Sequence, residues 1–193
     1  MSSRPIHVAV IIGSTRAGRF APTVAKWFVG QAESRADMTI DIIDLAVVKL
    51  PETLGEFGGA PIAEVVAVTP RLAAADAFVV VTPEYNHSYP AALKSAIDWH
   101  YDEWQAKPVA FVSYGGVSGG LRAVEHLRHV FAEVHAVAIR DVVSFHGAWH
   151  NFDADGNPKN PEECNAAAKT LLDQLTWWAV ALAEAREKRP YVA

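Results

Sequence analysis

Short runs of apolar residues, many of them β-branched, alternate along this chain with longer segments of helical periodicity. Runs of this kind are typical of strands that are buried on both faces of a parallel sheet. We expect strands at 6–12, 38–45, 76–82, 108–113 and 136–145. We expect helices at 21–34, 62–75, 91–104, 121–134 and 162–188. This regular alternation predicts a parallel sheet with helices packed on both of its faces.

Five strands in this arrangement fit a three-layer α/β/α sandwich of the flavodoxin-like type, with strand order 2-1-3-4-5. The 193 residues suit a single domain covering 1–193, because that length is enough for a substantial core. Pro70 lies inside the second predicted helix, and we expect it to kink or split that helix. We also expect a bend in the fifth strand.

The composition argues against several classes of function. Hydrophobic residues make up 51% of the chain and the formal net charge is −5, which does not suit a general nucleic-acid-binding protein. No stretch approaches the roughly 18 apolar residues that a membrane span needs. Cys164 is the only cysteine, so no disulfide can form within the chain, which fits a reducing compartment. We therefore expect a soluble, cytoplasmic protein with no nucleic-acid or membrane partner.

The three least ordinary loops of the sequence follow the first, third and fourth predicted strands. They read GSTRAGR from Gly13, PEYNHSYP from Pro83 and YGGVSGG from Tyr114. In open α/β sheets, ligands bind beyond the carboxyl ends of the strands, near the point where the strand order reverses. Strands one, three and four are neighbours in a 2-1-3-4-5 sheet, so these loops are expected to meet and to form a ligand site.

The first of these loops has the features of an anion-binding turn. A turn between a strand and a helix exposes backbone N–H groups, and the start of the helix adds its partial positive charge. Ser14, Thr15, Arg16 and Arg19 can all donate to a phosphate. The turn has neither the GxxxxGK(S/T) pattern of triphosphate-binding loops nor the GxGxxG pattern of dinucleotide sites, which favours a monophosphate. A solvated turn with two incidental arginines is the alternative.

The other two loops could hold the group attached to that phosphate. In the second loop, Glu84 and Asn86 offer hydrogen bonds and a flat heterocycle could stack on Tyr85. The alternative is an ordinary turn in which Ser88 caps the next helix, and both roles can coexist. The third loop carries four glycines in YGGVSGG, which allow a ligand to approach the backbone closely. Packing alone could also require those glycines.

Together these motifs resemble the NADPH-dependent FMN reductase family of flavodoxin-like fold. The resemblance is carried by GSTRAGR before a helix, by TPEYNHSYPAALKSAIDW and by SYGGVSGGLRAVEHLR, and it extends from about Ile6 to Ala185. The family includes FMN reductases and quinone, azo-dye and chromate reductases. The resemblance implies that the whole chain is one FMN-binding domain.

The resemblance also implies which residues bind the FMN. The phosphate is expected at Ser14, Arg16, Arg19, Phe20 and Ala21. The ribityl chain and isoalloxazine are expected along Pro83, Glu84, Tyr85 and Asn86. The other edge of the ring is expected against Ser113, Tyr114, Gly115 and Gly116. Where many members have a Ser or Asn, this chain has Arg19 to Pro22, so we expect Arg19 or backbone N–H groups to make that phosphate contact.

The implied function is that of an FMN-dependent NAD(P)H oxidoreductase. NADPH or NADH would deliver hydride to N5 of the flavin and leave, and a flavin, quinone or similar small acceptor would then take the electrons in a ping-pong scheme. No catalytic side chain is expected, because the flavin carries the chemistry. The alternative is a flavodoxin-like electron carrier without direct NAD(P)H oxidation. Such carriers tend to display a strongly acidic surface, and the net charge of −5 of this chain is only mildly acidic by comparison.

The family resemblance further implies a homodimer or homotetramer. Trp99, His100, Tyr101 and Trp104 are interface candidates, with packing inside the chain as the alternative. Trp177 and Trp178 on the last helix are expected to pack in the core.

One pair of histidines has a spacing that could chelate a metal on a helix. His146 and His150 are four residues apart, but Gly147 and the following NFDADGNP indicate a loop. We therefore expect no metal site.

Overall fold

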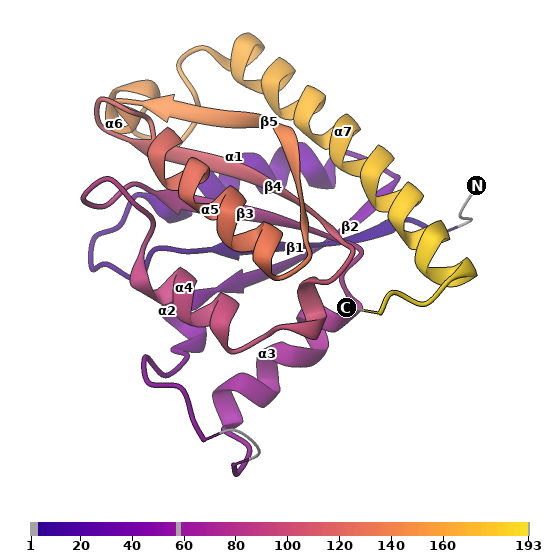
Figure 1. The fold of residues 1–193 in the computed structure, drawn as a ribbon. Coiled ribbons are helices and arrows are strands. Elements are labelled where there is room, and N and C mark those ends of the chain that lie inside the picture. Colours follow the sequence, from indigo (N-terminus) through magenta and orange to yellow (C-terminus); the bar gives the residue numbers. More distant parts are fainter. Residues whose placement is uncertain (1–3, 57–58, 193) are drawn as a thin grey trace.

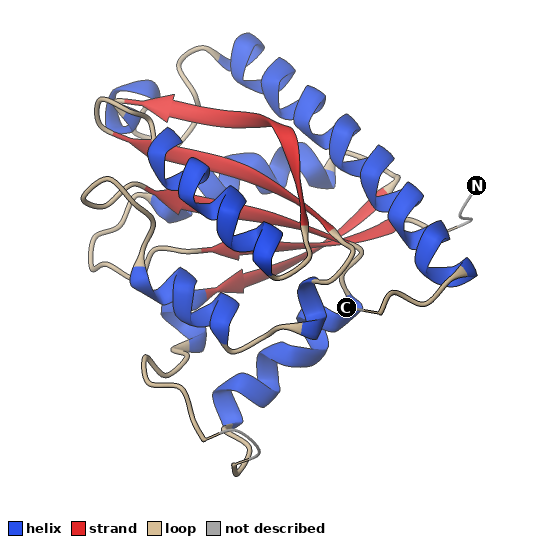
Figure 2. Cartoon of the chain, in the orientation of Figure 1, coloured by secondary structure: helices blue, strands red, loops and turns tan. Residues whose placement is uncertain are grey.

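The sheet has the predicted parallel topology. In a computed structural model that describes residues 4–56 and 59–192, five strands are ordered β2-β1-β3-β4-β5, which confirms the flavodoxin-like order. All neighbouring pairs are parallel, and Figure 2 shows the strands running in one direction. The strands are β1 (Ile6–Ile12), β2 (Met38–Asp44), β3 (Ala77–Pro83), β4 (Pro108–Gly115) and β5 (Val137–His146).

Helices cover both faces of this sheet, which gives the expected three layers (Figure 1). α1 and α7 pack on one face, and α3, α4 and α5 pack on the other. None of the described helices is long and apolar enough to cross a membrane. The helices are α1 (Ala21–Glu33), α2 (Leu45–Val48), α3 (Ala63–Ala74), α4 (Ala91–Asp98), the 3₁₀ turn η1 (Asp102–Trp104), α5 (Leu121–Glu133), α6 (Ala148–Asn151) and α7 (Pro161–Lys188).

The central strands show why the apolar runs in the sequence are continuous. In β1, Val8 and Val10 face the core under α1 and α7, whereas Ala9 and Ile11 face the core under α3, α4 and α5. Because side chains alternate between the faces of a strand, a strand covered on both sides must be apolar at every position. The predicted bend in the fifth strand is confirmed by a register shift between β4 and β5, at Val109 and Phe111.

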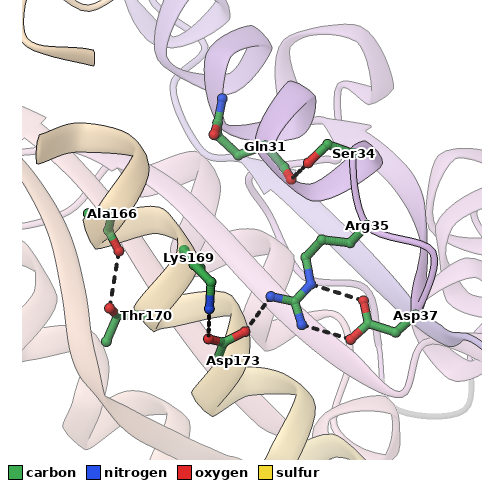
Figure 3. Close-up of polar contacts among 8 residues, drawn as sticks. All are labelled: Gln31, Ser34, Arg35, Asp37, Ala166, Lys169, Thr170 and Asp173. Carbon is green, nitrogen blue, oxygen red and sulfur yellow. Dashed lines mark hydrogen bonds and ion pairs between the residues drawn. The ribbon is translucent and has the colours of Figure 1, made fainter. Parts of the chain in front are cut away.

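A network of ion pairs ties α7 to the turn between α1 and β2 (Figure 3). Arg35 donates from Nε and Nη2 to Asp37, at 2.9 and 2.7 Å, and from Nη1 to Asp173 on α7, at 2.5 Å. Lys169, one turn before Asp173, donates to the same carboxylate at 2.6 Å. These ion pairs hold the pKa of Asp173 below its ordinary value. The network adds partly exposed ion pairs to the apolar contacts that hold α7 on this face of the sheet.

Pro70 does not split its helix. α3 runs without interruption from Ala63 to Ala74 with Pro70 inside it. Proline has no N–H group to donate to the carbonyl of Val66, four residues earlier, so α3 lacks that one helical hydrogen bond. Next to it, the hydroxyl of Thr69 donates to the carbonyl of Val65 at 2.9 Å.

The predicted helix at 91–104 is wrong in its second half. α4 ends at Asp98, and the chain turns before η1 so that Trp104 becomes fully buried. Its indole N–H donates to the carbonyl of His100 at 2.6 Å, and His100 is itself buried. Both therefore belong to the core, and their assignment as interface candidates is wrong. Trp99 is half-buried with its indole N–H on the carbonyl of Pro51, whereas Tyr101 is exposed.

The prediction that Trp177 and Trp178 pack in the core is also wrong. Trp177 is 64% exposed and Trp178 is 36% exposed. Successive residues of a helix point about 100° apart, so only one stripe can face the sheet. On α7 that stripe consists of Ala168, Leu171, Leu172, Leu175 and Ala179. The two tryptophans lie beside the stripe and not on it.

Candidate functional site

A cavity of about 390 Å³ lies where the loops after β1, β3 and β4 meet. The strands set this meeting point: the N–H of Gly13 donates to the carbonyl of Val81 at 2.9 Å, and the N–H of Glu84 donates to the carbonyl of Tyr114 at 3.3 Å. The cavity is lined by Arg16, Ala17, Gly18, Arg19, Phe20, Pro83, Glu84, Tyr85, Tyr114, Gly115, Gly116 and Trp149.

The turn after β1 presents a row of free backbone donors. The N–H groups of Thr15, Arg16, Ala17 and Gly18 have no hydrogen-bond acceptor within the described part of the chain. Gly18 has a φ of +65°, a conformation that glycine adopts without strain. The helix that follows begins after Phe20, whose side chain cannot cap it. The unpaired N–H groups and the helix start make this turn a suitable cradle for an anion.

The two arginines of this turn have different surroundings. Arg16 is exposed, and its guanidinium makes no ion pair or hydrogen bond to any residue of 4–56 or 59–192. The guanidinium of Arg19 pairs with Asp44 at the end of β2, at 2.5 and 2.6 Å, and donates to the carbonyl of Ser14 at 2.6 Å. Arg16 is thus the cation of the cradle without an ion-pair partner, whereas the charge of Arg19 is already balanced by Asp44.

The loop after β3 folds back on itself in a tight turn. Tyr85 and Ser88 exchange two backbone hydrogen bonds, at 2.8 and 3.0 Å. Asn86 and His87 between them have φ values of +48° and +73°, as the central residues of the tightest hairpin turns do. The turn directs the Tyr85 hydroxyl to Oγ of the fully buried Ser14, at 2.7 Å. This contact joins the second loop to the cradle.

Glu84 serves a neighbouring helix as well as lining the cavity. Its carboxylate accepts from the backbone N–H of Arg122 at 3.1 Å and pairs with the guanidinium of Arg122 at 3.0 Å, in the first turn of α5. Burial raises the pKa of Glu84, but hydrogen bonds from Ser118 and from Arg122 outweigh it and hold the pKa below its ordinary value. The carboxylate is therefore ionised at neutral pH, and it takes the place of a cap at α5, where Gly120 has no side chain.

The loop after β4 forms the opposite wall with little side-chain bulk. A Cβ atom on Gly115 would lie 3.2 Å from the backbone nitrogen of Gly120, so this wall is packed against its own loop. Tyr114 lines the cavity with a ring edge toward Phe20, at 6.2 Å between centroids. Its hydroxyl is buried and makes no hydrogen bond of normal geometry among the described residues, and burial outweighs the nearby Ser14 hydroxyl and raises the pKa of Tyr114.

A profile of the family described as NADPH-dependent FMN reductase matches residues 6–150. The chain belongs to this family. The residues matched by the NADPH-dependent FMN reductase profile include all five strands and the three loops that meet at the cavity.

Relatives and solved structures agree with that membership. The NAD(P)H-dependent FMN reductase of Schizosaccharomyces pombe is 37% identical over 131 residues, a match that spans 64% of this chain and 64%, less than two thirds, of the relative. The quinone reductase of Escherichia coli K12 is 30% identical over 189 residues, which are 94% of this chain and 96% of the relative. A flavoenzyme NAD(P)H:(acceptor) oxidoreductase from Paracoccus denitrificans has a similar structure, with a TM-score of 0.73 at 26% identity over 91% of this chain and 98% of that one.

In this FMN reductase family member, most of the residues expected to bind the cofactor line the cavity. Those that line it are Arg16, Arg19, Phe20, Pro83, Glu84, Tyr85, Tyr114, Gly115 and Gly116. Four expected residues do not line it: Ser14, Ala21, Asn86 and Ser113. Ser14 reaches the site only through Tyr85, and the hydroxyl of the fully buried Ser113 donates to the carbonyl of Gly119 at 2.9 Å. Their contact with a ligand stays a prediction.

Sequence reasoning missed Trp149 at the rim of the cavity. It lies on α6, directly after β5, and its side chain is 57% exposed. The loop is held beside the third loop by the N–H of Gly147, which donates to the carbonyl of Gly116 at 2.8 Å. The predicted strand order could have indicated it. The fifth strand lies beside the fourth, so the loop that follows it must come to the same edge of the sheet. Among the described residues, no group of three His, Cys, Asp or Glu side chains could hold a metal ion.

Proposed function

We propose that this chain is an FMN-dependent NAD(P)H oxidoreductase that passes electrons to flavins, quinones or similar small acceptors. The observation that carries the proposal is the row of unpaired N–H groups from Thr15 to Gly18 beside the unpaired guanidinium of Arg16. Such an arrangement suits a single phosphate group. It lies in a cavity whose other walls are aromatic rings and glycine backbone, which suit a flat heterocycle.

The residues present fit FMN at both ends of the cavity. In the proposal, Arg16 and the unpaired N–H groups of the turn hold the phosphate, and Ser14 supports the turn through its contact with Tyr85. The second loop, Pro83–Asn86, lies along the ribityl chain and ring, and the third loop, Ser113–Gly116, lines the ring's other edge. Bound FMN would supply a hydride acceptor at N5 for NADPH or NADH. The chain itself binds and orients, so no side chain acts as nucleophile or general base.

The names of the relatives support the same class of reaction, because an FMN reductase and a quinone reductase are among them. A homodimer or homotetramer and a cytoplasmic location go with this proposal as expectations from the sequence. The exposed indole of Trp149 at the rim suits stacking with a planar acceptor.

The test is anaerobic reduction of the purified protein, reconstituted with FMN where necessary. We expect NADPH or NADH to bleach the flavin absorbance, and a panel of quinones and free flavins to restore it. A protein that binds FMN but is bleached only by dithionite would be an electron carrier. A protein that cannot be reconstituted with FMN would refute both functions.

A further inference from the structure

Arg19 lies in the proposed phosphate cradle but is occupied by protein groups. Nη1 and Nη2 each donate to one oxygen of the Asp44 carboxylate, at 2.5 and 2.6 Å, and Nη1 also donates to the carbonyl of Ser14, at 2.6 Å. These bonds use three of the five N–H donors of the guanidinium. A two-pronged arginine–carboxylate pair of this kind is among the strongest polar contacts in proteins.

Both side chains of this ion pair are largely shielded from water. The side chain of Arg19 is 15% exposed and that of Asp44 is 20% exposed. Breaking a partly buried pair from one side leaves the other charge without compensation, so the contact has a fixed geometry. The hydrogen bond with Asp44 also raises the pKa of Arg19, which keeps it charged.

Asp44 is itself anchored in two ways. It ends β2 opposite Ile12, the last residue of β1, so its carboxylate lies beside the turn that follows β1. Its side chain also accepts from the N–H of Ala46 at 3.0 Å and thereby caps α2. The carboxylate is therefore a fixed point on the sheet from which Arg19 reaches back to the backbone of the cradle.

We propose that Arg19 is a positioning residue and not a phosphate ligand, and that with Asp44 it braces the Ser14–Gly18 turn in its anion-binding shape. This inference rests on the proposed function. It divides the two arginines of the turn into one ligand, Arg16, and one brace, Arg19. It also adds Asp44, which lies 25 residues beyond Arg19, to the residues on which phosphate binding depends.

The two roles of Arg19 predict opposite effects of the change D44N. If Arg19 is a brace, losing the charged partner loosens the turn and weakens FMN binding. If Arg19 is a phosphate ligand restrained by Asp44, the same change releases its charge to the phosphate and tightens FMN binding. Asparagine is as good a helix cap as aspartate, so α2 keeps its cap in this variant.

The experiment measures the dissociation constants of FMN and of riboflavin, which lacks the phosphate, on the full chain stripped of flavin. We expect D44N and R19Q each to weaken FMN binding about tenfold or more. The double variant should be no weaker than either single variant, because both remove the same contact. R19K should not restore affinity, because lysine cannot form the two-pronged pair. Riboflavin binding should weaken much less than FMN binding in all of them, because riboflavin has no phosphate for the turn to hold.

D41N is the matched control. Asp41 is on the same strand and pairs with Arg71 of α3, away from the cradle. It should leave FMN affinity unchanged. Tighter or unchanged FMN binding by D44N would overturn the inference while the proposed function stands. A wild-type chain that binds neither FMN nor riboflavin would overturn the proposed function itself.

Discussion

The hydroxyl of Tyr85 lies 2.7 Å from Oγ of Ser14, across 71 positions of sequence. This is the contact that closes the loop after β3 onto the turn after β1. Ser14 is fully buried, so its hydroxyl depends on Tyr85 and not on water. The shape of the proposed phosphate cradle is thereby linked to the loop proposed to lie along the flavin ring.

We expect Tyr85→Phe to destabilise the protein and to weaken FMN binding. The change removes the hydrogen bond between Tyr85 and the buried hydroxyl of Ser14, which costs about 1–3 kcal/mol. Urea unfolding of the flavin-free chain measures the loss of stability, and a flavin titration measures the loss of affinity. Tyr89→Phe is the control, since Tyr89 is half-buried outside the cavity lining. Equal stability of the two variants would contradict the prediction.

Arg16→Ala should weaken FMN binding and leave the stability of the flavin-free chain unchanged. Removing a charge-assisted contact to phosphate costs about 1.5–3 kcal/mol. No ion pair within residues 4–56 and 59–192 is lost with this side chain, so unfolding in urea should not change. Arg140→Ala, which removes a side chain that is 90% exposed, is the control. The phosphate assignment fails if the Kd for FMN is the same in both variants.

The buried ammonium group of Lys107 should make the protein more stable as the pH rises above 8. Its Nζ donates to the carbonyls of Leu72 and Ala73 near the end of α3, at 3.0 and 2.9 Å. Burial, and then the charge of Arg186, lower the pKa of Lys107 from 10.5 to about 8. Between these two values the unfolded chain binds more protons than the folded chain, so the free energy of unfolding increases with pH.

The measurement is urea unfolding at pH 8, 9 and 10. Lys107 should contribute a rise of up to roughly 3 kcal/mol across its window, at about 1.4 kcal/mol per pKa unit. Lys107→Met should remove that rise, whereas Lys159→Met, at an exposed position, should keep it. Parallel pH profiles for wild type and Lys107→Met would contradict the assignment.

Two glycine substitutions should change stability in opposite directions. Gly120 has a φ of +88°, and an added Cβ would lie 2.7 Å from Cβ of Ser113 and 3.0 Å from the backbone nitrogen of Tyr114. We expect Gly120→Ala to cost about 2 kcal/mol or more. Gly30 lies inside α1 with no atom within 4 Å of an added Cβ, so Gly30→Ala should stabilise by about 0.5–1 kcal/mol. Urea midpoints that move in the same direction would contradict this reasoning.

Features set by local sequence were predictable, and those set by distant contacts were not. The run at Ile6–Ile12 has to be a buried strand because it is apolar at every position. Its position next to β3 then brings the GSTRAGR turn to the ligand edge. In contrast, Asp44 resembled only the polar end of a strand, since nothing near it in sequence indicates its pairing with Arg19.

The orientation of one helix and the end of another account for the other two wrong predictions. Trp177 and Trp178 belong to a helix of 28 residues, and which stripe of it faces the sheet is decided by packing along its whole length. Trp104 was predicted to continue a helix, and its burial required the chain to leave that helix six residues earlier, at Asp98. Tertiary packing overrode helical propensity there, as it commonly does.

The position of α7 also bears on how the chain is synthesised. The strands end at His146, yet one face of the sheet gains its second covering helix only with residues 161–188. During translation, Val112 on β4 and Val143 on β5 therefore lack the leucines of α7 that cover them in the finished protein. A nascent chain with apolar surface uncovered is prone to aggregate. The cover of this face is therefore complete only once residues 161–188 have been made and have folded onto it.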